Sequence, residues 1–384
     1  MNDLLRDTLT AQADSVEPPP LDLTAIIAAG NHRRSRRRLL TVASGTAVAL
    51  AGGGLAIAAG RKHRVPSLPF TERRVTYAVG SDLHYGNETI SVAPHRITAF
   101  VQTDAGFVFL NQENEIHLAD HTGVRGLGKG TWRLTADVRG NLVAWVEGFN
   151  DHFESVVYDV NAQRELVRTS AGNRIPPNVS LVADPRVVAL DGNLAYFGAY
   201  DGFYRWDVIT NKGERIAKVP LGAVRAVAAG QIVFQQPLTQ RPPAVGLAIA
   251  RTVSTAAPAK FTGQQAFLSP SAKYLVTEPT DALPVIEPGW ADLALYEVAS
   301  ARKVGLPYAY DHVYFGQWLG DEKFVAAGKR RFSKSAETDL LVVTAASGAV
   351  RVAVPAFSTL RFSTTPPRNA PFALPTGSAI TDLY

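Results

Sequence analysis

Residues whose types and spacing could support chemistry gather in two short segments of this sequence. The first segment contains Asn150, Asp151, His152 and Glu154. The second contains a run of aromatic, acidic and histidine side chains: Tyr308, Tyr310, Asp311, His312, Tyr314 and Trp318. Carboxylates near a histidine can hold a cation and move a proton, and aromatic rings beside polar groups suit the faces and hydroxyl groups of sugars.

Two interpretations of these segments stay open. In the first, a small polar ligand or a glycan contacts Tyr308, Tyr310, His312 and Trp318, together with Asn150, Asp151 and His152. In its enzymatic form, Asp151, Glu154 and Asp311 surround a central cation and His152 carries the proton. In the second interpretation, the charged side chains are solvated loop tips and the aromatic rings are core packing.

Other motifs for catalysis or metal binding are weak or missing. His117 and His121 are four residues apart, but one is expected in a strand and the other in the following turn, so they should diverge. The sequence has no phosphate-binding loop, no HExxH motif, no EF-hand loop, no G-x-S-x-G elbow and no cysteine. We therefore expect no cofactor and no metal, and the sequence favours a protein that is not an enzyme.

A membrane segment precedes the part of the chain that holds these residues. Residues 39–60 carry no charge, and as a helix rising about 1.5 Å per residue they would span roughly 33 Å, enough to cross a bilayer. The flanking arginines are Arg33, Arg34, Arg36, Arg37 and Arg38. This dense positive charge favours a cytoplasmic N-terminus and an extracytoplasmic C-terminal domain.

The same arginines resemble a twin-arginine export signal, because Ser35 to Thr41 reads SRRRLLT. Cleavage after Ala56-Ile57-Ala58 would release the domain as a secreted protein, and this alternative to a permanent single-pass anchor stays open. Residues 1–38 read as a short helical cytoplasmic tail. It is either a simple tether or a docking piece for an intracellular partner.

The net charge of +5 does not indicate nucleic-acid binding, because the excess lies beside the membrane segment. Arg61, Lys62 and Arg64 add to it on the far side, and the remaining residues, 65–384, are almost balanced in charge. We expect no nucleic-acid partner for this domain.

A strand that ends in an acidic or polar residue, followed by a turn, recurs at roughly 40 to 50 residues, as the four-stranded blades of a propeller do. The recurring anchor positions are Asp120, Asp159, Asp207, Ala250 (a degenerate copy), Glu297 and Thr344. The carboxylate at such a turn is expected to accept backbone N–H bonds. Residues 75–92 resemble a further hairpin, and with inner strands from 357–384 they would complete a seventh blade. The repeats predict six or seven blades and favour seven.

These features together resemble uncharacterised actinobacterial membrane-anchored β-propellers of the WD-repeat-like or TolB-like kind. The resemblance implies a mainly β fold, a propeller preceded by a single transmembrane helix. The expected organisation is a tail at 1–38, the membrane helix at 39–60, a linker at 61–74 and an extracytoplasmic propeller at 75–384.

The function expected from this organisation is a non-catalytic binding or interaction platform at the cell envelope. Its ligand is an unidentified protein, peptide or glycan, and the closed propeller should be monomeric. Two alternatives remain. One is a propeller hydrolase or lactonase with a metal in the central channel, and the other is the sensor half of a transmembrane signalling protein.

Overall fold

A computed structural model of the protein describes residues 69–378, apart from 132, 150–151, 176–184, 238–245, 279–292, 308, 331–336 and 360–370. The expected cytoplasmic tail, membrane segment and export signal lie outside the described residues, as do residues 61–68 of the expected linker. Within the described ranges, no helix is long and apolar enough to cross a membrane.

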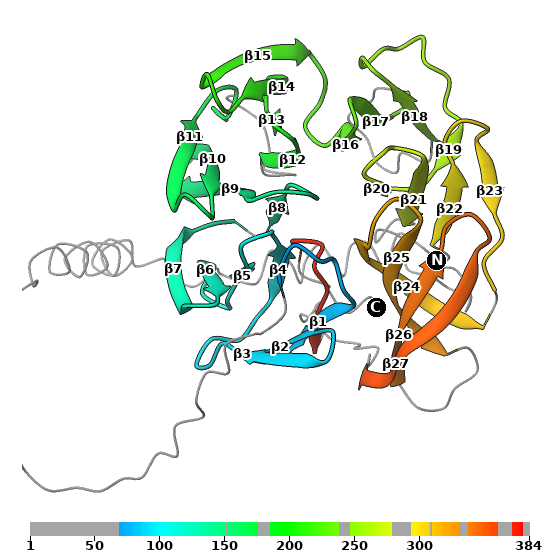
Figure 1. Ribbon diagram of the computed structural model, residues 1–384. Coiled ribbons are helices and arrows are strands. Elements are labelled where there is room, and N and C mark those ends of the chain that lie inside the picture. Colours follow the sequence, from blue (N-terminus) through cyan, green and yellow to red (C-terminus); the bar gives the residue numbers. More distant parts are fainter. Residues whose placement is uncertain are drawn as a thin grey trace, which may run out of the picture. The chain divides into compact units, whose positions relative to one another are not determined.

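The described residues form seven four-stranded antiparallel sheets, arranged as blades around a centre (Figure 1). Six blades take their four strands consecutively from the chain. Blade 1 contains β4 (Ala99–Gln102), β5 (Phe107–Leu110), β6 (Glu115–Asp120) and β7 (Gly123–Lys129). Blade 2 contains β8 (Leu134–Ala136), β9 (Leu142–Phe149), β10 (His152–Asp159) and β11 (Arg164–Thr169). Blade 3 contains β12 (Arg186–Asp191), β13 (Leu194–Ala199), β14 (Gly202–Asp207) and β15 (Lys212–Ala217).

The next three blades follow the same order from the channel outward. Blade 4 contains β16 (Val224–Ala228), β17 (Gln231–Gln235), β18 (Gly246–Ala250) and β19 (Phe261–Thr262). Blade 5 contains β20 (Gln265–Leu268), β21 (Tyr274–Glu278), β22 (Ala294–Glu297) and β23 (Arg302–Val304). Blade 6 contains β24 (Tyr310–Trp318), β25 (Lys323–Arg330), β26 (Glu337–Thr344) and β27 (Ala349–Thr359). The seven-bladed propeller that the repeats favoured is therefore confirmed.

Blade 7 is built from both ends of the described chain. Its three outer strands are β1 (Thr76–Val79), β2 (Asp82–Tyr85) and β3 (Glu88–Ser91), and its inner strand is β28 (Phe372–Ala373). In the register of this sheet, Ala78 faces Ala373 and Val79 faces Phe372. The predicted closure is confirmed, with one inner strand from the C-terminal region. Closing the ring places every inner strand edge at the channel, where no further strand can add.

The chain continues from β28 into the channel. The Gly377 N–H donates to Phe100 O of blade 1 at 2.9 Å, and the Leu134 N–H of blade 2 donates to Gly377 O at 2.7 Å. Gly377 has a φ of 75°, and a Cβ built on it would lie 1.9 Å from Leu134 O, so only glycine fits this crossing. The segment after β28 thus ties blade 7 to blades 1 and 2.

The core lies between blades rather than inside them. Seven hydrophobic clusters of described residues each join two consecutive blades, including the pair formed by blades 7 and 1. A middle strand such as β5 is buried along its whole length, whereas the outermost strand of blade 3, β15, is mostly exposed. A single blade would expose both apolar faces, so the ring as a whole is the stable unit.

The recurring anchors lie at the turn between the third and fourth strands of blades 1 to 6, as the repeats predicted. Asp159 Oδ1 accepts hydrogen bonds from the N–H groups of Asn161 and Ala162, each at 2.9 Å. Asp207 does the same for Ile209 and Thr210. Four residues after the anchor, the backbone is left-handed in four blades, at Gln163, Asn211, Ala301 and Gly348. The turn geometry therefore repeats even where the residue types differ.

Removing residues 365–384 should destabilise the protein strongly, because it deletes β28 together with Leu374 and Gly377. Phe372 and Leu374 are buried to 3% and 0% exposure, and each such side chain contributes about 1.5–3 kcal/mol. We expect thermal unfolding of the full-length protein to move down by roughly 10 °C or more. Removing only residues 379–384 is the control and should change the melting temperature little. Equal melting temperatures for the two truncations would contradict closure by both termini.

Candidate functional site

The inner strands surround a central channel that contains a cavity of about 210 Å³. Residues from β4, β8, β12, β16, β20 and β24, and from the segment after β28, line this cavity. Every blade therefore contributes to one shared space, the usual kind of place for a ligand on a rigid scaffold.

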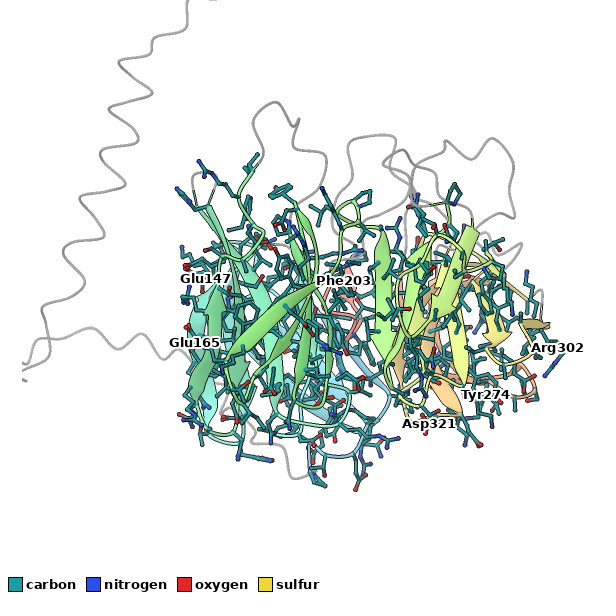
Figure 2. The ribbon with its side chains drawn as sticks, turned by 90° about the horizontal axis from the view of Figure 1, so that it is seen from above. Glu147, Glu165, Phe203, Tyr274, Arg302 and Asp321 are labelled. Atoms are coloured by element: carbon teal, nitrogen blue, oxygen red, sulfur yellow. The ribbon has the colours of Figure 1, made fainter. Side chains whose placement is uncertain are left out.

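All inner strands run in the same direction along the channel, as contacts at both ends show. Where β12 and β16 begin, Arg186 Nη2 donates to Val224 O at 2.6 Å. Where they end, the N–H of Gly230 donates to Asp191 Oδ2 at 3.0 Å. The channel thus has two mouths of different composition. In the side view of Figure 2, Asp321 lies at the end where the inner strands finish.

At the first of these ends, which we call the arginine mouth, Arg133, Arg186 and Arg225 lie at the beginnings of three consecutive inner strands, β8, β12 and β16. Arg133 and Arg225 line the cavity. Neutral oxygens hold all three: Arg133 Nε donates to Ser378 Oγ at 2.7 Å, Arg186 Nη2 donates to Val224 O, and Arg225 Nη2 donates to Gln235 Oε1 at 3.2 Å. None of the salt bridges within the described residues involves these three arginines.

The three guanidinium groups repel one another. Burial and the charges of Arg133 and Arg225 lower the pKa of Arg186 to about 9. Burial and the charge of Arg133 also lower the pKa of Arg225. Burial lowers the pKa of Arg133, which the charge of Glu278 partly offsets. An arginine remains protonated at neutral pH, so these shifts indicate positive charge that the surroundings do not fully compensate.

Several arginines elsewhere in the described residues are paired directly with carboxylates. Arg125 Nη1 lies 2.6 Å from Asp120 Oδ2, and Arg330 Nε lies 2.6 Å from Asp339 Oδ2. Arg168 alone contacts three glutamates, Glu147, Glu154 and Glu165, at 2.7–2.9 Å. Glu147 and Glu165 lie on blade 2 in Figure 2. The arginine mouth differs from this pattern, because within the described residues its half-buried guanidinium groups have neutral oxygens as their hydrogen-bond partners.

The opposite end, which we call the acidic mouth, carries Asp104, Asp137 and Asp191. Burial raises the pKa of Asp137, and the charges of Asp191 and Asp104 add to the effect. Arg73 Nη2 lies 2.8 Å from Asp104 Oδ1, and an Arg139–Asp321 ion pair at 3.4 Å connects blades 2 and 6 across this mouth. Among the described residues, no group of three or more His, Asp or Glu side chains is placed to hold a metal ion.

The chain also enters the propeller at the acidic mouth. Gln102 Nε2 donates to Phe70 O and Glu72 O, both at 2.8 Å, and Gln317 Nε2 donates to Arg74 O at 2.6 Å. Both amides are buried, and both lie at the ends of inner strands. The first described residues are therefore fixed at the acidic mouth, at the other end of the channel from the arginine mouth.

The residues that the sequence singled out in the aromatic segment have different surroundings. Tyr308 and the side chains of Asp311 and His312 lie outside the described part. The Tyr310 hydroxyl donates to Asp339 Oδ2 at 3.2 Å, and burial raises its pKa. The Asp339 side chain is fully buried, and Arg330 and the Ala356 N–H lower its pKa despite that burial. Tyr310 is thus part of a structural network in blade 6.

Trp318 is a packing residue in the structure, as the second of the two interpretations of the aromatic segment expects. It is 5% exposed and lies in the core between blades 5 and 6, with its ring 5.2 Å from that of Phe324. It also borders the channel cavity, where its Nε1 has no hydrogen-bond partner within the described residues.

Glu154, which belongs to the other expected cluster, lies away from the channel. Glu154 is on β10, the third strand from the channel, where Arg168 of the outermost strand β11 binds it at 2.8 Å. The structure therefore contradicts its expected place around a central cation. His152 is exposed at the start of β10, and Asn150 and Asp151 lie outside the described residues. The ligand-binding role of His152, Tyr310 and their neighbours stays a prediction.

His117 and His121 diverge, as expected. The His117 ring lies 4.0 Å from that of His95, whereas the His121 ring lies 4.4 Å from that of Phe70. Burial and the charge of His95 lower the pKa of His117. These two histidines do not share a ligand.

Sequence reasoning missed the arginine mouth. A signal was present, since an arginine lies at or next to the start of each of three apolar inner strands, in RLTA, RVVAL and VRAVA. An arginine at the start of a strand can be interpreted as a solvated end residue. These three arginines come close together only when the propeller closes into a ring.

Comparison with known proteins finds similar solved structures but no matching family. No protein-family model and no curated protein matches the sequence. Solved structures do match, among them TolB from Acinetobacter baumannii, at 13% identity and a TM-score of 0.41 over 77% of this chain and 66% of that chain. The β-propeller domain of the Trilobed protease from Pyrococcus furiosus matches at 12% identity and a TM-score of 0.46, over 67% of this chain and 84% of that one. By its sheet topology, the protein is a seven-bladed β-propeller.

Replacing Trp318 by Ala should lower the stability of the full-length protein by about 3–5 kcal/mol, because it empties a buried aromatic site between two blades. Thermal unfolding should shift down by roughly 10 °C. Ile209→Ala is the matched control, since Ile209 is 70% exposed and should tolerate the change. A Trp318→Ala protein that melts like the wild type would show that this indole is not part of the core.

Proposed function

We propose that the protein is a non-catalytic binding platform of the cell envelope, held at the membrane by residues 39–60, and that it takes its ligand in the central channel. One observation carries the proposal. Nε of Arg186 and Nε of Arg225, at the arginine mouth, are buried N–H donors that have no acceptor within the described residues. A buried donor without an acceptor is unfavourable by about 1–3 kcal/mol, so a bound ligand that supplies acceptors would be stabilised there.

The scaffold supports this use of the channel. Arg186 and Arg225 lie on inner strands that are fixed by sheet pairing on one side and by the packing of neighbouring blades. Donors held on rigid strands lose little conformational entropy on binding. The ligand can therefore be recognised without a large rearrangement.

The first described residues lie away from the arginine mouth. Gln102 and Gln317 bind them at the acidic mouth, at the opposite end of the channel. The extracytoplasmic location itself rests on the arginine run before residue 39 and remains part of the proposal.

Two single-cysteine variants test location and channel use together, since the chain has no cysteine of its own. Val352 is 39% exposed on β27, the outermost strand of blade 6, and Gln265 lines the channel at the start of β20. In intact spheroplasts, a membrane-impermeant maleimide should label Val352→Cys as fast as it does after lysis. It should label Gln265→Cys more slowly in spheroplasts than in the purified protein, because a ligand occupies the channel.

The location of the domain and the use of the channel would be contradicted by different results. Labelling of Val352→Cys only after lysis would show that the domain is not outside. If Gln265→Cys reacts equally fast in spheroplasts and after purification, while Val352→Cys is accessible in both, the channel is not the binding site.

A further inference from the structure

We propose that the arginine mouth binds a small oxyanion carrying two or more negative charges, of the phosphate or polycarboxylate class. This inference rests on the proposed function, because it names the ligand chemistry of the same channel. It depends on Arg133, Arg186 and Arg225, on their hydrogen-bond partners and on the cavity beside them.

Three guanidinium groups from consecutive blades act on one another, and of the acids in the described residues Glu278 alone acts on them, through Arg133. Their hydrogen-bond partners within the described residues are a hydroxyl, a carbonyl and an amide oxygen, all neutral. A ligand with a single negative charge would leave most of this positive charge uncompensated, whereas a dianion or trianion would offset it.

The remaining N–H donors of these arginines have a geometry that suits an oxyanion. A guanidinium group carries five N–H donors, and the contacts described above use few of them. In Arg186 and Arg225 the Nε–H is among those left over. Nε and Nη donors lie on one edge of the planar group and match the two oxygens of a carboxylate or phosphate. The neutral contacts therefore position the arginines while leaving paired donors for an oxyanion.

The size of the cavity limits the size of the ligand. The cavity of about 210 Å³ corresponds to several water molecules, at about 30 Å³ of liquid volume each. It can admit a phosphate group or a small polycarboxylate, but no folded partner. The ligand is therefore a small molecule or the anionic end of a larger one.

Thermal unfolding of the full-length protein in nonionic detergent tests the proposal, with sodium phosphate and sodium citrate titrated at pH 7 against sodium chloride of equal ionic strength. At least one of the two anions should raise the melting temperature in a saturable manner, since a ligand that binds only the folded state stabilises it. The anion whose effect saturates at the lower concentration shows whether the site prefers phosphate or a polycarboxylate.

Variants assign the effect to the arginine mouth. Arg225→Met should weaken the apparent affinity at least tenfold and, without anion, should melt at or above the wild-type temperature because one repelling charge is gone. Arg225→Lys keeps the charge but loses the paired donors, and should bind with intermediate affinity. Arg302→Met is the matched control, because Arg302 is exposed on β23 and pairs with Glu297 at 3.2 Å. Its response to anions should be unchanged.

The proposal is overturned if neither anion exceeds the chloride control, or if Arg225→Met responds like the wild type. These results are separable from failure of the channel platform. Slower labelling of Gln265→Cys in spheroplasts together with no anion effect would mean that the channel takes a different ligand. Equal labelling together with no anion effect would remove both proposals.

Discussion

The pairing of β28 with β1 is the constraint on which the rest of the structure depends. Two residues of the C-terminal region, Phe372 and Ala373, complete a sheet whose other strands come from the beginning of the described domain. Because this pairing closes the ring, each blade buries both faces against a neighbour and each inner strand faces the same channel. The first and last residues of those strands are then forced into two narrow mouths, whatever their charge.

At the acidic mouth some of the charges are paired inside the protein, through Arg73 with Asp104 and Arg139 with Asp321. At the arginine mouth they are not. Half-buried cations that have no carboxylate partner in the described part of the chain oppose folding. Such an unfavourable arrangement is kept where function requires it. Binding of a multiply charged oxyanion is a requirement that this arrangement would meet, and the neutral contacts of the three arginines are consistent with it.

Features with a local cause could be predicted from the sequence. Asp159 and Asp207 were expected to accept backbone N–H bonds at repeated turns, and the hairpin at 75–92 was expected to share a blade with the C-terminal region; both predictions are confirmed. The arginine mouth could not be predicted in the same way, since Arg133, Arg186 and Arg225 meet only after the ring closes. For Trp318, sequence alone could not decide between a loop contact and core packing, because the same aromatic run serves either one, and burial between blades is a tertiary property.

The most direct measurement is an experimental structure of the protein determined in the presence of sulfate, a small dianion with phosphate-like geometry. Our interpretation predicts a sulfate ion in the channel, within hydrogen-bond distance of guanidinium groups of Arg133, Arg186 and Arg225, with the propeller otherwise unchanged. A carboxylate of the protein itself lying between the three arginines, in place of the ion, would contradict the central claim that their charge awaits an external anion.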